Sequence, residues 1–250
     1  MRRIKLIVAY DGTEYSGWQI QPEAPTIEMY LDKAIRELTG ENVHVTGASR
    51  TDAGVHAYGN VAVFDTESTI PGDRFTFALN RFLPDSIVIQ DSWEVSSDFH
   101  PRHCNTRKTY EYRILNTAVP LPQKRNFTWH VAGSIDIEKM KEAAVYIVGF
   151  KSFCCVRTQA ESTVRTIYSL EVLQEGSEII IRIKGNGFLY NMVRIITGTL
   201  IQVGKGRFKP EYVKQMLEAK DRTVAGQTAP PQGLTLVGIE YVDNDDARVV

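Results

Sequence analysis

Apolar and polar residues alternate at the start of the chain in the pattern of a half-buried β-strand. Residues 3–9 place Ile4, Leu6 and Val8 on one side of such a strand. The sequence Tyr-Asp-Gly at residues 10–12 is typical of a turn. We therefore expect the chain to begin with a strand that turns back sharply.

A helical pattern follows. Five apolar residues fall on one helical face: Ile27, Leu31, Ala34, Ile35 and Leu38. Thr26 stands where an N-cap is expected, and Gly40 stands at the end. The same patterns predict the other elements. Strands are expected at 43–46, 60–64, 87–95, 109–115, 166–173, 178–184 and 234–242, and helices at 74–82, at 137–148, from about 188 and at 210–219. This order predicts an α+β fold made of two similar units, residues 1–105 and 106–250.

Composition agrees with a folded, water-soluble chain. Of 250 residues, 43% are apolar, and the formal net charge is −1. No apolar stretch approaches the roughly 18 residues of a membrane span, and the amino terminus has no secretory pattern, so we expect a cytoplasmic protein. Three cysteines, Cys104, Cys154 and Cys155, make no disulfide framework. We interpret the adjacent pair as small packing residues.

The small net charge hides an asymmetry between the two halves. Residues 1–105 carry 9 basic and 15 acidic residues, whereas residues 106–250 carry 20 and 15. Six basic residues between 99 and 125 stand against the single acid Glu111, with tyrosines and histidines among them. Such a segment is suited to a polyanion such as RNA or DNA, although from charge alone a solvated surface is the more common explanation.

Several common sites are excluded by their spacing. Gly198 to Lys205 has the wrong interval for a phosphate-binding loop and lacks the hydroxyl residue after the lysine. Gly185 and Gly187 lack the third glycine of a dinucleotide loop. His100 to Cys104 has no second pair of ligands for a metal. We therefore expect no metal and no cofactor.

The segment Gly-Ala-Ser-Arg-Thr-Asp-Ala-Gly-Val-His-Ala at residues 47–57 gathers polar and charged groups in irregular chain after a strand. Loops held by strands often carry catalytic groups, and Asp52 is suited to serve as a nucleophile or a base. Equally, Asp52 can cap the amides of an ordinary turn. From the residues alone, both interpretations stay open.

This segment resembles the active-site motif of the TruA family of tRNA pseudouridine synthases, and the resemblance runs along nearly the whole chain. Four other blocks resemble motifs of that family in the same order. They are 10–12 with 17–21, 99–102 with 110–112, 187–194, and 229–234.

The resemblance implies an isomerase that converts uridine to pseudouridine without cofactor or metal. It implies the pseudouridine synthase fold, in which the antiparallel sheets of two α+β units join into one central sheet beside a basic cleft. The implied substrate is tRNA, at positions 38, 39 and 40 of the anticodon stem-loop, and the implied assembly is a homodimer.

The resemblance also implies roles for single residues. Asp52 is the essential ionised carboxylate, and Arg194 is its cationic partner. Arg50 fills space opened in the RNA or grips a phosphate. Tyr110 stacks on the target base and assists proton removal at C5. Leu234, with Pro230, walls the uracil pocket.

Basic residues elsewhere are candidates for phosphate contacts. They are Arg102, Arg107, Lys108, Lys124, Arg125 and Lys205. Each assignment has a structural alternative, since Arg194 suits an exposed helix position and Tyr110 a strand core. His56 and Trp18 are interpreted as structural. Two other functions stay open: the same isomerisation on a different RNA, and a catalytically silent RNA-binding or chaperone protein.

Overall fold

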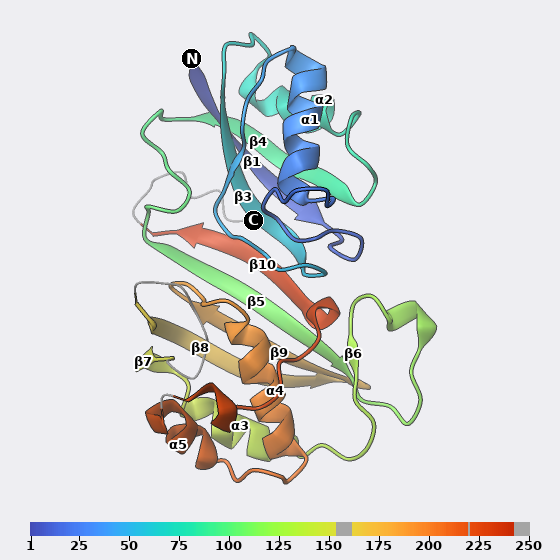
Figure 1. The fold of residues 1–250 in the computed structure, drawn as a ribbon, viewed down its shortest axis with the longest axis vertical. Coiled ribbons are helices and arrows are strands. Elements are labelled where there is room, and N and C mark those ends of the chain that lie inside the picture. Colours follow the sequence, from blue (N-terminus) through green and yellow to red (C-terminus); the bar gives the residue numbers. More distant parts are fainter. Residues whose placement is uncertain (154–161, 220, 243–250) are drawn as a thin grey trace. The chain divides into compact units, whose positions relative to one another are not determined.

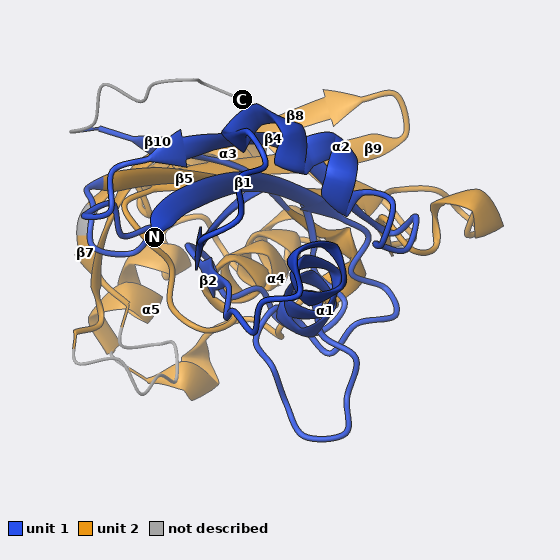
Figure 2. Ribbon diagram, turned by 90° about the horizontal axis from the view of Figure 1, so that it is seen from above, with its two compact units in different colours: residues 1–105, 236–250 blue, residues 106–235 orange. Residues whose placement is uncertain are grey.

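The computed structural model describes residues 1–153, 162–219 and 221–242 (Figure 1). They form two compact units (Figure 2). Unit 1 is Met1–Asn105 with the chain from Leu236 onward, and unit 2 is Thr106–Thr235. Each unit packs helices against antiparallel strands, so the predicted α+β class is confirmed. The joining of the two sheets beside a basic cleft stays a prediction, as do the roles predicted for the two units.

Unit 1 is built on strands in the order β4-β1-β3-β10, and the short strand β2 also pairs with β3. The strands are β1 (Arg2–Tyr10), β2 (Thr46–Gly47), β3 (His56–Thr66), β4 (Ile87–Val95) and β10 (Leu234–Tyr241), whose residues from Leu236 belong to this unit. β1 runs antiparallel to both β3 and β4. Because β10 is a neighbour of β3, the end of the chain returns to the first unit.

The helices of unit 1 are α1 (Ile27–Thr39) and the short α2 (Phe75–Leu79), which follows the 3-10 turn η1 (Gly72–Arg74). The Thr26 side chain accepts a hydrogen bond from the amide of Met29, and Gly40 ends α1 with φ 77°. These are the N-cap and the left-handed C-cap that the sequence predicts. The two helices pack on each other, and Phe75 meets Phe64 of β3 edge-on at 5.3 Å.

A cluster of buried apolar residues in unit 1 gathers around β1, β3 and β4. Its buried members are Ile7, Ala48, Val61, Val63, Trp93, Val95 and Phe99. Ala48, which begins the irregular chain after β2, therefore packs against the sheet. The segment that carries the candidate catalytic residues thus starts from a fixed core position.

Unit 2 has a sheet in the order β5-β9-β8-β7, all antiparallel, with β6 beside β5. The strands are β5 (Thr106–Leu115), β6 (Trp129–His130), β7 (Gly149–Ser152), β8 (Val164–Glu175) and β9 (Glu178–Gly185). The helices are α3 (Ile137–Val145), α4 (Met192–Gly204) and α5 (Tyr212–Ala219). α3 packs on α4 and β8, and α4 also contacts β5. Short 3-10 turns lie at Pro122–Lys124 (η2), Arg222–Val224 (η3) and Pro231–Gly233 (η4).

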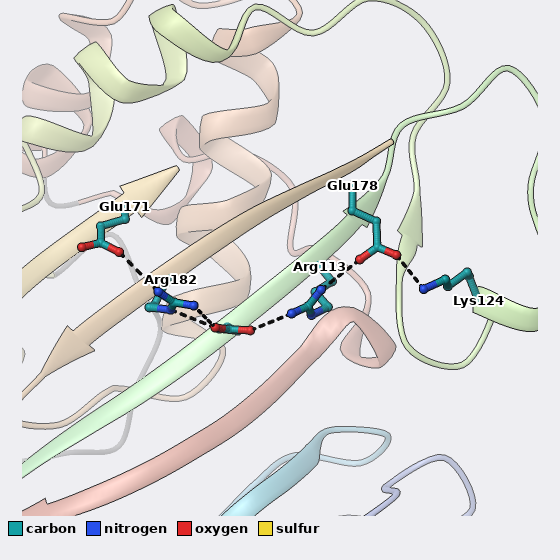
Figure 3. Close-up of polar contacts among 6 residues, drawn as sticks. Arg113, Lys124, Glu171, Glu178 and Arg182 are labelled. Atoms are coloured by element: carbon teal, nitrogen blue, oxygen red, sulfur yellow. Dashed lines mark hydrogen bonds and ion pairs between the residues drawn. The ribbon is translucent and has the colours of Figure 1, made fainter. Parts of the chain in front are cut away.

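A chain of ion pairs crosses the strands of unit 2 (Figure 3). Its members, in order, are Glu171 on β8, Arg182 on β9, Glu111 and Arg113 on β5, Glu178 on β9 and Lys124 in η2. The neighbouring charged atoms are 2.7–3.7 Å apart. Each charge therefore has a partner of opposite sign. Glu111 can be buried, with 7% of its surface exposed, because two arginines pair with its carboxylate.

Three predicted elements differ from the structure. The strand expected at 43–46 is reduced to Thr46–Gly47, because the amide of Val45 donates to the carboxylate of Asp32 at 2.8 Å instead of to a strand. The helix expected from about residue 188 begins at Met192. The helix expected at 74–82 is the short pair η1 and α2.

Two short strands, β6 and β7, were not among the predicted elements. The packing role predicted for Cys154 and Cys155 concerns residues outside the described part of the chain. No helix in the described ranges combines the length and apolar character that crossing a membrane requires.

Candidate active site

The loop between β2 and β3 carries Asp52. Along it, Ser49 and Thr51 are buried, whereas Arg50 is exposed and Asp52 is partly exposed. The carbonyl oxygen of Asp52 accepts a hydrogen bond from the amide of Val55 at 3.1 Å, which closes a turn. The loop thus buries Ser49 and Thr51 on either side of the exposed Arg50, and Asp52 follows directly after a buried residue.

Two glycines permit the segment after β1 to pack directly on this loop. Gly17 has φ 91°, and a Cβ atom there would lie 2.6 Å from the carbonyl oxygen of Thr51. At Gly12, a Cβ atom would collide with the carbonyl group of Val55. The amide of Trp18 donates to the carbonyl oxygen of Thr51 at 3.0 Å. The loop is therefore held from one side by main-chain contacts that larger residues would prevent.

Trp18 and His56 support the same loop. Trp18 is fully buried, and its ring occupies the space beside Gly47, so its predicted packing role is confirmed. His56 is 3% exposed, and its Nδ1 accepts a hydrogen bond from the amide of Gly12 at 3.0 Å. A histidine enclosed in this way supports the predicted structural role.

Two cations lie close together in unit 1. Arg102 donates from Nε to the carbonyl oxygen of Gly47 at 2.7 Å, which fixes its side chain beside the start of the Asp52 loop. Burial lowers the pKa of Arg102, and the positive charge of Arg50 lowers this pKa further, against an opposing effect of Glu28. A bound anion between Arg50 and Arg102 would relieve their repulsion.

In unit 2, the alternation of β5 separates the candidate residues onto two faces. Lys108, Tyr110 and Tyr112 share one face, as the even spacing predicts, and both tyrosines are buried. Arg107 lies on the other face, where its guanidinium is 5.3 Å from the ring centre of Tyr168. Arg107 is therefore separated by the sheet from the tyrosine that the motif places on the target base.

Tyr110 is 7% exposed. Its ring meets that of Phe188 edge-on, with centres 5.2 Å apart at 83°. Phe188 precedes α4, so the loop between β9 and α4 fixes the orientation of the Tyr110 ring.

Arg194 stands in the first turn of α4 and is held by two hydrogen bonds. Its Nε donates to the carbonyl oxygen of Ala229 at 2.7 Å, and its Nη1 donates to Oδ1 of Asn191 at 2.7 Å. Asn191 adopts φ 58°, a left-handed conformation that asparagine tolerates better than most residues. The guanidinium plane is thereby fixed instead of projecting as an ordinary exposed helix charge.

The segment before β10 packs on Tyr112. The Tyr112 hydroxyl donates to the carbonyl oxygen of Pro230 at 2.7 Å, and a Cβ atom at Gly233 would lie 2.6 Å from the ring. Burial raises the pKa of Tyr112, with a partly opposing effect of Arg194. Leu234, which follows, is 6% exposed. Tyr112 therefore anchors the part of the chain that carries the predicted uracil wall.

The remaining basic candidates are distributed over unit 2. Lys124 pairs with Glu178 at 2.8 Å, and Arg125 is exposed with one hydrogen bond to the carbonyl oxygen of Pro122. Lys205 is exposed at the end of α4. Within the described ranges, no three His, Cys, Asp or Glu residues gather in a way that could hold a metal ion.

Two of the five sequence blocks, 187–194 and 229–234, thus converge in unit 2 with residues 110–112 of the middle block, whose residues 99–102 belong to unit 1. The Asp52 block and the block at 10–21 converge in unit 1. The association of Asp52 with Arg194 and Tyr110 stays a prediction. The supporting roles of Phe188 and Asn191 were not predicted, although both lie inside a recognised block.

Comparison with known proteins agrees with these blocks. A family model described as tRNA pseudouridine synthase matches residues 6–103 and 143–242. Proteins named tRNA pseudouridine synthase A are 48% identical over 244 residues in Thermoanaerobacter sp. (strain X514) and 49% over 245 residues in Ruminiclostridium cellulolyticum. Both matches cover 96% of this chain and 100% of the relative. The chain is also similar at 11% identity to a chain of a solved Cbf5-Nop10-Gar1 complex, with TM-score 0.30, covering 93% of this chain and 56% of that one. On its family match and its close relatives, this chain belongs to the tRNA pseudouridine synthase family, and the predicted pseudouridine synthase fold follows from that membership.

Proposed function

We propose that the protein isomerises uridine to pseudouridine in tRNA, at positions 38, 39 and 40 of the anticodon stem-loop. The observation that carries the proposal is the Asp52 loop, which is held by buried contacts on both sides of Asp52 while Asp52 itself is partly exposed. Relatives that match 96% of the chain bear the name of this activity.

The reaction needs no oxidant, reductant or external group. The bond between N1 of uracil and C1′ of ribose breaks, the base turns, and C5 bonds to C1′. The proton on C5 then leaves to solvent, and N1 takes up a proton. Side chains that trap an electron-poor sugar and hold a detached base supply what these steps require, and the proposal therefore includes no cofactor.

Asp52 is proposed as the essential carboxylate. It either attacks C1′, as the nucleophile of a glycosidase does, or removes a proton from the ribose. Both roles require the ionised form. Arg194 is proposed as the cation that favours this form, and the two hydrogen bonds to Ala229 and Asn191 support the role because they fix the direction of the guanidinium.

Tyr110 and Leu234 are proposed to hold the target base. The edge-on contact with Phe188 keeps the Tyr110 ring in one orientation, which suits it to stack on an extruded uracil. Stacking of a base on an aromatic ring contributes roughly 1–3 kcal/mol. Leu234 begins β10 next to the segment that Tyr112 anchors, in keeping with a wall of the pocket.

The basic residues are proposed to contact phosphates. Arg50 with Arg102 offers two neighbouring cations for one phosphate, and Lys108 shares the face of Tyr110. Arg125 and Lys205 are exposed. Two other basic candidates are placed less directly. Arg107 lies on the face of β5 opposite Tyr110, and a phosphate at Lys124 would compete with the carboxylate of Glu178. For these two, the proposal concerns RNA away from the target base.

We also propose that the protein acts as a homodimer in the cytoplasm, where one subunit would help to hold the tRNA bound by the other. Light scattering of the purified protein, with and without tRNA, tests the assembly. A monomer under both conditions would contradict it.

Tritium release from C5 of labelled uridine in an unmodified tRNA tests the activity. We expect release by the wild type without added metal or cofactor, and none by the Asp52→Ala variant. Mapping the modified positions then separates the anticodon stem-loop from another RNA substrate. Tight tRNA binding without release by the wild type would instead support the silent RNA-binding protein.

A further inference from the structure

Three polar side chains form a buried chain of hydrogen bonds beneath the Asp52 loop. Asn60 of β3, which is fully buried, donates from Nδ2 to the hydroxyl oxygen of Tyr10 at 3.3 Å and to the carbonyl oxygen of Ser49 at 2.9 Å. The hydroxyl groups of Tyr10 and Thr51 are 2.8 Å apart. Tyr10 and Thr51 are 5% and 7% exposed, so solvent does not replace these bonds.

The direction of the two bonds made by Asn60 follows from the donors available. Nδ2 of Asn60 can only donate, and its bond to the Ser49 carbonyl oxygen fixes which end of the amide faces the loop. The oxygen of Tyr10 therefore accepts from Asn60, and the hydroxyl groups of Tyr10 and Thr51 share a hydrogen bond in which either oxygen can be the donor. The chain runs from the core strand β3, through the end of β1, to the residue that precedes Asp52.

Thr51 is thus fixed at two points. Its carbonyl oxygen accepts from the amide of Trp18 at 3.0 Å, and its hydroxyl group is hydrogen-bonded to that of Tyr10. These contacts fix the peptide that joins Thr51 to Asp52. The orientation of this peptide sets the direction in which the Asp52 side chain leaves the main chain.

We propose that Tyr10 is a positioning residue for Asp52, acting through Thr51 with Asn60 as its support. The proposal rests on the proposed isomerase activity. A displacement of about 1 Å at a catalytic group can lower a rate about 100-fold. Loss of one hydroxyl group that fixes the neighbouring residue is therefore expected to lower the catalytic rate while leaving contacts to the tRNA in place.

The first test compares Tyr10→Phe with Tyr15→Phe by tritium release, measuring kcat and KM separately, and by thermal unfolding. The Tyr15 hydroxyl makes a part-buried bond, 2.6 Å to Oγ of Ser86, so the control variant also loses a phenolic hydrogen bond in unit 1. Tyr10→Phe loses the bonds to both Thr51 and Asn60. We expect a lower Tm in both variants, with the larger decrease in Tyr10→Phe. We expect kcat to fall about 10-fold in Tyr10→Phe alone, with KM for tRNA unchanged. Wild-type kcat in Tyr10→Phe, or an equal loss in both variants, would overturn the proposal.

A second pair of variants tests the Thr51 end of the bond between Tyr10 and Thr51. Thr51→Ser keeps the oxygen that Tyr10 contacts, whereas Thr51→Val replaces it with a methyl group of similar size. We expect the serine variant to keep most of its kcat and the valine variant to match Tyr10→Phe. The double variant Tyr10→Phe with Thr51→Val should be no slower than either single variant, because both remove the same bond. Multiplied losses would overturn the proposal, whereas an inactive wild type would count against the isomerase function itself.

Discussion

Arg194 and Ala229 exchange two hydrogen bonds: Nε of Arg194 donates to the carbonyl oxygen of Ala229 at 2.7 Å, and the Ala229 amide donates back to the carbonyl oxygen of Arg194 at 3.1 Å. This reciprocal pair ties the first turn of α4 to the segment that leads into β10. The arginine is thus connected to the predicted uracil wall at Leu234 through the main chain. A change at Arg194 would affect both parts of the proposed site.

The first prediction concerns Arg194→Lys, which keeps the charge and removes the planar group. In the wild type, Nε and Nη1 of Arg194 donate to Ala229 and Asn191 from two fixed positions of one planar group. A lysine has a single nitrogen and cannot occupy both positions. We expect kcat for tritium release to fall about 100-fold, with the protein still folded by circular dichroism.

Asn191→Gly provides the comparison for this variant. It removes the contact with Nη1 of Arg194, and glycine accepts the φ of 58° without strain. We expect a smaller loss of kcat, because the bond from Nε to Ala229 remains. Wild-type kcat in Arg194→Lys would show that the fixed guanidinium plane is not needed.

The second prediction concerns the close approach at Gly17. In Gly17→Ala, the Cβ atom would lie 2.6 Å from the carbonyl oxygen of Thr51 at φ 91°, so the Asp52 loop must move. We expect both a lower Tm and a lower kcat. The matched variant is Gly40→Ala, where φ is 77° but no atom lies within 4 Å. It should cost about 1–2 kcal/mol of folding free energy from backbone strain alone and leave kcat unchanged. Equal kcat in the two variants would contradict the prediction.

The third prediction concerns the pH dependence of stability. Burial raises the pKa of Glu178, but hydrogen bonds from Lys124 and Arg113 outweigh it, and the net pKa lies below the ordinary value of 4.5. A lowered folded-state pKa means that the stabilisation is complete above the unfolded pKa and is lost as the pH falls through the folded value.

Urea unfolding from neutral pH to below pH 4.5 measures this effect. We expect Glu178→Gln to be less stable than the wild type at neutral pH by on the order of 1 kcal/mol, with the difference shrinking as acid is added. Glu175→Gln, an exposed neighbour on β8, should show no such trend. A constant difference between Glu178→Gln and the wild type at every pH would rule out the ion pairs as its cause.

The fourth prediction concerns salt. If Lys205 contacts a phosphate, Lys205→Gln should reduce the slope of log affinity for tRNA against log salt concentration by about 0.7 to 0.9. Lys141→Gln removes a charge of the same kind from α3, where the ammonium is 2.8 Å from Glu138, and should leave the slope unchanged. Equal slopes for wild type and Lys205→Gln would remove Lys205 from the proposed phosphate contacts.

Elements with strong local signals were predictable from the sequence. The helix α1 matches its prediction because Thr26 and Gly40 define both ends within a few residues. The start of α4 was predicted too early, since Asn191 takes a left-handed conformation that no pattern of apolar residues signals. The strands β6 and β7 have two and four residues, too few for an alternating pattern.

The candidate site shows the same division. Asp52, Tyr110 and Arg194 are candidates because their blocks resemble a family, and their catalytic roles stay predictions. That Tyr110 and Tyr112 share one face of β5 was predictable from their spacing. The support beneath Asp52 could not be predicted, because Tyr10 and Thr51 are separated by 41 positions and Tyr10 and Asn60 by 50. A single sequence contains no signal that joins hydroxyl and amide groups over such intervals.

The row of ion pairs in Figure 3 bears on how RNA reaches the protein. Its three carboxylates and three cations alternate, so their fields cancel at any distance larger than the spacing between neighbours. Arg113 and Lys124, which belong to the basic run of the sequence, therefore add little to long-range attraction. Electrostatic guidance of an approaching tRNA must come from cations outside this row, and the rate of encounter should be insensitive to mutations that remove a whole oppositely charged pair from it.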